Sequence, residues 1–185
     1  MKMKKIIPML LLLIALGYSI FQLTEKKQEE KKVSKNDSYI ASIQKIGVQV
    51  GQQAPDMELM TLDQKKVKLS SYKGKKVILN YWATWCPPCQ DEIPVLEKFY
   101  QKHKKDIVIL GVADYIGEKK DLNFVKNFVS KNNMHYQILL DEKGDNFRKY
   151  GVISIPTTFF INPNGEVIYK QIGPLNEKQL NQFLK

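Results

Sequence analysis

Cysteine is scarce in this chain of 185 residues, which contains only Cys86 and Cys89. A fold held together by disulfides needs cysteines that are distant in sequence, because the entropic benefit of a crosslink grows with the loop that it closes. The loop between these two cysteines is minimal. The sequence therefore excludes a disulfide-stabilised scaffold and predicts a reactive pair.

Arginine is nearly absent, since Arg148 is the only one, although the formal net charge is +10. Half of the surplus comes from residues 1–47, so the positive charge is spread along the chain. Proteins that bind nucleic acids rely on arginine for bidentate contacts to phosphate and guanine. We therefore predict a lysine-rich solvated surface and no nucleic-acid partner.

The two histidines do not supply ligands for the cysteine pair. A zinc site would need two further ligands at a spacing such as His-x₃₋₅-His, whereas His103 and His135 are far apart. Covalent haem attachment would need a histidine directly after Cys89, where the sequence has Gln90. We expect neither a metal nor a cofactor.

An uncharged, largely apolar run covers residues 6–24. As a helix it would be about 28 Å long, close to the hydrocarbon thickness of a bilayer, about 30 Å. A cleavable signal peptide is the competing interpretation, because a small-x-small cleavage site ends at Gly17. The apolar run continues past that site to Leu23, which favours an uncleaved transmembrane signal-anchor over residues 6–23.

The segments around this run predict the topology. The short flank at residues 1–5 favours a cytoplasmic N-terminus, although more lysines follow the run than precede it. Residues 24–47 are polar and cannot bury enough surface to offset their ordering entropy, so they predict a flexible linker. We expect residues 48–185 to form one folded domain on the extracytoplasmic side of the cell membrane, held by a single pass, and to act as a monomer.

The pattern of this domain predicts an α/β fold. Three apolar runs are expected to be strands of a parallel sheet: 77–82, 107–110 and 136–140. Apolar residues at helical spacing lie between them, which predicts βαβ units. Further strands are expected in an N-terminal hairpin at 56–60 and 67–69, and in a second hairpin around the turn at 162–165. The result is a central mixed sheet flanked by helices.

Cys86 lies where the strand over 77–82 gives way to a helix. Unpaired N–H groups and the positive end of the helix dipole stabilise a thiolate there, and the thiolate is the form that attacks a disulfide. Cys89 lies one turn deeper on the same face and can attack the mixed disulfide that Cys86 forms. Pro87 and Pro88 fit the first turn, where their missing N–H groups are not needed.

Several motifs resemble the ResA/TlpA group of thioredoxin-like proteins. They are Gly51–Asp56, Leu69–Lys75, Asn80–Cys89, Glu92–Pro94 and Ile155–Phe159. The resemblance covers essentially all of residues 48–185 and implies a thioredoxin-like fold. It implies a membrane-anchored thiol-disulfide oxidoreductase that takes electrons from a CcdA-like membrane donor. It implies exported disulfides as substrates, such as the oxidised Cys-x-x-Cys-His of apocytochromes c in cytochrome c maturation.

The resemblance also implies roles for individual residues. Pro156, after Ile155, resembles the family's cis-proline, which offers the preceding backbone to a bound substrate strand. Glu92 resembles an acid near the thiols, although an acid there also fits simple complementation of the helix dipole. Because Asn80 stands where thioredoxins keep a buried aspartate, Glu92 is the candidate base for Cys89.

We expect three catalytic residues: Cys86, Cys89 and Glu92. The expected substrate-binding residues are Trp85, Pro87, Pro88, Ile155 and Pro156.

Other functions compete with this one. Exported disulfides other than those of apocytochromes, such as those of the spore envelope, are the alternative substrates. A peroxiredoxin-type thiol peroxidase shares the fold, but Ala83 stands where peroxiredoxins use a threonine. A tethered binding module without chemistry is a third possibility, and the intact pair of Cys86 and Cys89 argues against it.

Overall fold

The computed structural model describes most of the chain. The described residues are 21–22, 47–118 and 121–184. The predicted flank at 1–5, almost all of the predicted anchor at 6–23 and almost all of the predicted linker at 24–47 lie outside them. Among the residues that are described, no helix is both long enough and apolar enough to cross a membrane.

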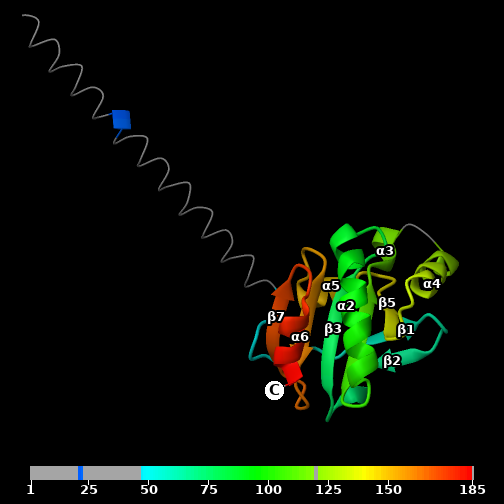
Figure 1. The fold of residues 1–185 in the computed structure, drawn as a ribbon, viewed down its shortest axis with the longest axis horizontal. Coiled ribbons are helices and arrows are strands. Elements are labelled where there is room, and N and C mark those ends of the chain that lie inside the picture. The colour runs from blue at the N-terminus through cyan, green and yellow to red at the C-terminus, as the bar shows by residue number, and fades with distance from the viewer. Residues whose placement is uncertain (1–20, 23–46, 119–120, 185) are drawn as a thin grey trace, which may run out of the picture. The chain divides into compact units, whose positions relative to one another are not determined.

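Contacts divide the chain into two units, residues 1–45 and 46–185. The second unit is built on a mixed sheet of seven strands within the described residues (Figure 1). Their order across the sheet is β2-β1-β5-β4-β3-β6-β7. The strands are β1 (Glu58–Thr61), β2 (Lys66–Lys68), β3 (Lys76–Trp82), β4 (Ile107–Ala113), β5 (Gln137–Leu140), β6 (Thr157–Ile161) and β7 (Val167–Ile172). The central strands β3, β4 and β5 are parallel, and the outer ones pair antiparallel.

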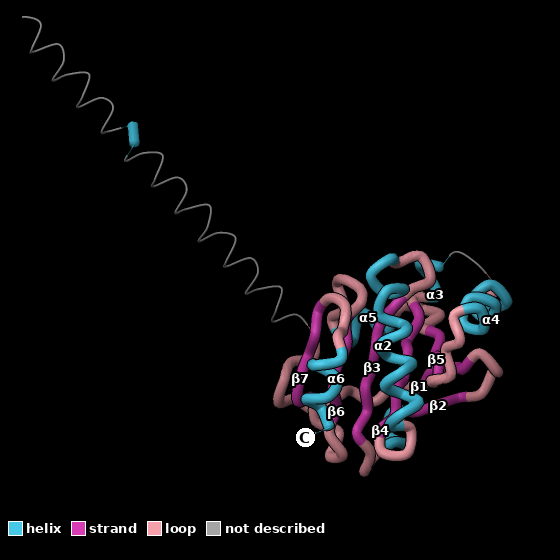
Figure 2. Tube along the Cα trace, viewed as in Figure 1, coloured by secondary structure: helices cyan, strands magenta, loops and turns pink. Residues whose placement is uncertain are grey.

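Helices cover both faces of the sheet. They are η1 (Leu69–Tyr72), α2 (Pro87–His103), α3 (Tyr115–Glu118), α4 (Leu122–Lys131), α5 (Asp145–Tyr150) and α6 (Glu177–Leu184). One core cluster joins the sheet to α2, α4 and α6, and a second joins the opposite face to η1 and α5. Figure 2 shows α2 and α6 on the viewer's side of the sheet. The predicted α/β fold with a mixed sheet and flanking helices is confirmed.

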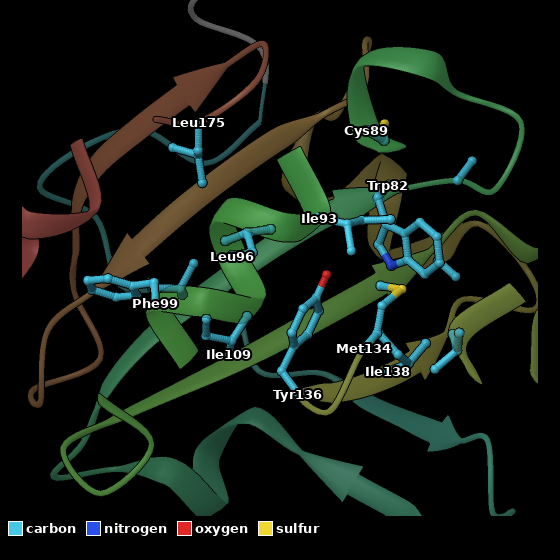
Figure 3. Close-up of a cluster of buried hydrophobic side chains, with 14 of the residues drawn as sticks. Trp82, Cys89, Ile93, Leu96, Phe99, Ile109, Met134, Tyr136, Ile138 and Leu175 are labelled. Carbon is cyan, nitrogen blue, oxygen red and sulfur yellow. The ribbon is translucent and has the colours of Figure 1, made fainter. Parts of the chain in front are cut away.

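Strand β3 supplies both cores, because successive side chains of a strand point to opposite faces. Ile78 and Trp82 pack in the cluster beneath α2, whereas Leu79 and Tyr81 pack in the other cluster. Asn80 shares the face of Ile78 and Trp82, so its polar amide is directed toward α2. Figure 3 shows Cys89 at one end of the first cluster, above Trp82. The helix that carries the cysteines therefore sits on a largely apolar base, in which Asn80 and Thr158 are polar.

Some local features differ from the sequence-based expectation. Leu69, expected at the end of a strand, begins the 3-10 helix η1, and its backbone N–H still donates to Met57. The short helices α3 and α5 were not expected, because four and six residues are too few to show a helical period. Asp141 accepts the N–H groups of Asn146 and Phe147, which fixes the start of α5.

Candidate functional site

Three loops meet at one edge of the sheet, where the cysteines lie. β3 pairs in register with the parallel strand β4 as far as Trp82 and Ala113, so the loops after both strands leave from the same edge. β6 runs antiparallel to β3 and begins at Thr157 opposite Tyr81, so the residues before Thr157 arrive at that edge as well. These segments are the loop 83–86, residues 114–118, which include the short helix α3, and the loop 153–156. Strand register therefore assembles the site from segments that are distant in sequence.

Cys86 and Cys89 form a disulfide at the start of α2, with their Cα atoms 5.3 Å apart. Cys86 is the N-cap residue, and Pro87 and Pro88 take the first two helical positions, as the spacing predicts. The backbone N–H groups of Cys89 and Gln90 donate to the Cys86 carbonyl oxygen. The positive end of the helix dipole therefore lies at Cys86, where it favours a thiolate once the disulfide is reduced.

The loop before β6 lies against the cysteines. The Ile155–Pro156 peptide bond is cis, as the resemblance implies. The Ile155 carbonyl oxygen lies 3.8 Å from Cys86 Sγ. The Pro156 carbonyl oxygen accepts the N–H of Gly173 at 2.8 Å, which ties this loop to the segment after β7. The structure thus brings Ile155 and Cys86 together.

The two tryptophans next to the pair have opposite environments. Trp82 is buried in the core, whereas Trp85 is 53% exposed. Pro87 and Pro88 are also exposed, while Pro156 is buried. The expected substrate-binding residues therefore divide into an exposed rim next to Cys86, formed by Trp85, Pro87 and Pro88, and the less accessible pair of half-buried Ile155 and buried Pro156.

Glu92 lies one turn beyond Cys89 and is only 2% exposed. Its Oε1 accepts the side-chain amide of Asn80 at 2.8 Å, and its Oε2 accepts the backbone N–H of Leu175 at 2.8 Å. Burial raises the pKa of Glu92 to about 7, although these two hydrogen bonds lower it. Asn80 also donates to Thr158 Oγ1, so the network joins α2, β3 and β6. An acid with this pKa can exchange a proton near neutral pH.

Glu118 is a second buried acid of the site, and the sequence did not single it out. It is 3% exposed, and its carboxylate accepts the N–H of Thr84 at 2.6 Å and the hydroxyl of the same residue. No spacing rule links two residues that are 34 positions apart. The sequence offers one signal for this contact. Glu118 follows β4, the parallel neighbour of β3, so the segments after the two strands begin at the same edge of the sheet.

Residues 47–118 and 121–184 contain no candidate metal site. No three His, Cys, Asp or Glu side chains in these ranges are grouped so that they could hold a metal ion. The reactive groups that the site brings together are two sulfurs and two buried carboxyl groups.

The fold and the Cys86–Cys89 pair at the start of α2 define a thioredoxin-fold thiol-disulfide oxidoreductase. Residues 50–170 match the AhpC/TSA family. The thiol-disulfide oxidoreductase ResA of Bacillus thuringiensis is 32% identical over 181 residues, which cover 98% of this chain and 93% of ResA. The chain therefore belongs to the AhpC/TSA family, among its ResA-like members.

Two further similarities agree with this assignment. Sporulation thiol-disulfide oxidoreductase A of Bacillus subtilis is 37% identical over 111 residues, covering 60% of this chain and 67% of that protein. The crystal structure of StoA from Bacillus subtilis matches with a TM-score of 0.63 and 31% identity. That match covers 73% of this chain and 99% of the StoA chain. The enzymatic class that the sequence predicts, thiol-disulfide oxidoreductase, is confirmed.

The raised pKa of Glu92 predicts a pH-dependent stability. Between pH 4.5 and about 7 the folded chain holds a proton that the unfolded chain has released, so stability falls as pH rises through this window. Glu92→Gln removes the titration. Relative to the wild type, this variant should gain about 3 kcal/mol in its free energy of unfolding between about pH 4 and pH 8. Urea unfolding of the oxidised proteins at several pH values measures the difference.

The exposed Glu142→Gln variant is the control for this measurement, because it removes a carboxyl group of the same kind from the surface. The difference in stability between this variant and the wild type, measured over the same pH range, is the baseline for the Glu92→Gln result. A pH-independent difference between Glu92→Gln and the wild type would contradict the assigned titration of Glu92.

Proposed function

We propose that the Cys86–Cys89 pair reduces disulfides of exported proteins on the outer side of the cell membrane. The observation that supports this most directly is the position of Cys86, which caps α2 and lies 3.8 Å from the Ile155 carbonyl oxygen. A substrate strand lying along the cis-proline loop would bring its own disulfide to that sulfur. Trp85, Pro87 and Pro88 form the exposed rim that such a strand would contact.

The proposed reaction has two exchange steps. The Cys86 thiolate forms a bond to one substrate sulfur, the substrate disulfide breaks, and the other substrate sulfur leaves as a thiolate. The Cys89 thiolate then attacks the Cys86 sulfur and displaces the first substrate sulfur. The substrate gains two electrons and becomes a dithiol, while Cys86 and Cys89 become a disulfide. A CcdA-like membrane thiol donor would reduce the pair again.

Glu92 has a proposed role in the second step, because the Cys89 thiol must lose its proton before it can attack. Glu92 lies three residues after Cys89 on α2, and its pKa of about 7 lets it accept a proton near neutral pH. The amide of Asn80 holds one carboxylate oxygen but cannot itself take up a proton. Glu92 is therefore the proposed base of the resolving step.

The proposed location follows from the apolar run at 6–23, with the linker as a tether. A flexible coil of the 21 residues from Glu25 to Lys45 would span about 25 Å. The thiols would then stay close to the membrane, where they can meet both a membrane electron donor and newly exported chains. Apocytochrome c with an oxidised Cys-x-x-Cys-His is the substrate that we propose.

The order of attack can be tested by trapping. Replacing Cys89 by Ala should accumulate mixed disulfides between Cys86 and exported proteins, because the resolving step is lost. Non-reducing electrophoresis followed by mass spectrometry of the trapped partners measures this. Cys86→Ala is the matched control and should trap few partners. If Cys86→Ala accumulates them instead, Cys89 is the attacking cysteine.

The proposed anchor predicts how the protein fractionates. The full chain should remain with the membranes during alkaline carbonate washing, because a transmembrane helix is not released by charge or pH. Immunoblotting of the membrane and soluble fractions gives the result. A soluble mature chain that begins near Tyr18 would show instead that the apolar run is a cleaved signal peptide.

The proposed substrate predicts a loss of haem attachment. Deleting the gene should lower the amount of covalently bound haem in c-type cytochromes, and an external dithiol should restore it. Haem staining of membrane proteins after denaturing electrophoresis provides the measurement. Normal haem attachment in a deletion strain without a redundant relative rules out this substrate and leaves the chemistry of Cys86 intact.

Spore-envelope disulfides are the second candidate substrates. The similarity to Sporulation thiol-disulfide oxidoreductase A over 111 residues supports this alternative. The trapping experiment with Cys89→Ala separates the two candidates, because the trapped partner is identified directly.

A further inference from the structure

Glu118 ends α3, and both of its carboxylate oxygens bind a single residue of the loop before Cys86. Oε1 accepts the backbone N–H of Thr84 at 2.6 Å, and Oε2 accepts the Thr84 hydroxyl. Burying a carboxylate costs several kcal/mol unless its oxygens are hydrogen-bonded. Because both oxygens of the buried Glu118 carboxylate bind Thr84, Glu118 restrains the position of the loop that contains Thr84.

Thr84 is held at three of its atoms. In addition to the two bonds that Thr84 donates to Glu118, its carbonyl oxygen accepts the side-chain amide of Gln90 at 2.6 Å. Gln90 lies in the first turns of α2, and the N–H of Cys86 donates to Ala83 on the other side of Thr84. Hydrogen bonds to both α3 and α2 thus hold the loop 83–86, which contains Cys86.

The same short helix also supports Trp85. A Cβ atom at Gly117 would lie 3.2 Å from Cζ2 of Trp85, so the backbone of α3 passes directly beside the indole ring. Ile116, next to Gly117, is exposed. Figure 1 shows α3 close to the end of α2 where the cysteines lie. Helix α3 therefore borders the exposed rim, and Glu118 fastens it there.

We propose that Glu118 is a positioning residue for disulfide exchange, because it fixes Thr84 and through it the Cys86 sulfur and the Trp85 ring. The proposal rests on the proposed role of Cys86 as the attacking sulfur. In that step the Cys86 sulfur forms a bond to one sulfur of the substrate while the substrate S–S bond breaks and the second sulfur leaves with the electron pair. A displacement of about 1 Å of a reacting atom can slow a reaction about 100-fold.

Four variants of the full chain test this proposal. Glu118→Ala removes both bonds to Thr84, and Thr84→Val removes only the hydroxyl bond. Glu118→Gln keeps one acceptor for the Thr84 N–H and offers an amide N–H to the hydroxyl oxygen. Asp114→Asn is the matched control, because Asp114 lies in the same segment but accepts the N–H of Gly117.

The primary readout is the rate at which the reduced chain reacts with oxidised glutathione. Glu118→Ala should lower this rate about tenfold and Thr84→Val about threefold, since misplacing the sulfur slows its attack. Glu118→Gln should stay within about twofold of the wild type, and Asp114→Asn should be unchanged. Acrylamide quenching of tryptophan fluorescence should rise in Glu118→Ala, because Trp85 loses its support.

Two results would overturn the proposal: equal rates for the wild type, Glu118→Ala and Thr84→Val, or an equal loss in Asp114→Asn. If Glu118→Ala does not fold, Thr84→Val and Glu118→Gln still decide, because a wild-type rate in Thr84→Val contradicts the restraint. A parallel assay with an oxidised Cys-x-x-Cys-His peptide tests the proposed function separately. A chain that reacts with glutathione but not with the peptide contradicts only the proposed substrate.

Discussion

The register of β3 against its two neighbours is the constraint on which the site depends. β4 runs parallel to β3 and β6 runs antiparallel to it, and the pairs Trp82 with Ala113 and Tyr81 with Thr157 fix where each strand ends. A slip by one residue would turn the apolar side chains of β3 to the wrong faces. It would also move the cis-proline loop relative to Cys86. The two apolar cores therefore hold the loops in alignment as well as stabilising the fold.

A buried polar network interrupts the apolar core between β3 and α2. Asn80 takes a place on β3 between Ile78 and Trp82, and its amide binds both Glu92 and Thr158. An amide can hold a carboxylate oxygen without competing for its proton. The titratable group of this network, Glu92, therefore lies on α2 rather than on the strand. Burial then places the pKa of Glu92 near neutral pH.

The sequence is most informative where a pattern is local. The continuous apolar run of residues 77–82, the helical spacing after Cys89 and the Cys-Pro-Pro-Cys motif predict the central sheet, α2 and the cysteine pair. Short elements such as α3 escape such patterns, because four residues complete barely one turn. The bond between Glu118 and Thr84 also escapes them, because it depends on which strands are neighbours. The bond from Leu175 to Glu92 spans 83 positions, for the same reason.

The bonds from Gly173 and Leu175 have a consequence for the order in which the protein is made. Gly173 holds the carbonyl oxygen of Pro156, and Leu175 holds one oxygen of Glu92. A ribosome synthesises both residues long after the two cysteines. While the chain is still emerging, Glu92 lacks the N–H of Leu175, and the Pro156 carbonyl oxygen lacks the N–H of Gly173. The redox centre therefore reaches its final electrostatic environment only when the last segment of the chain has folded onto it.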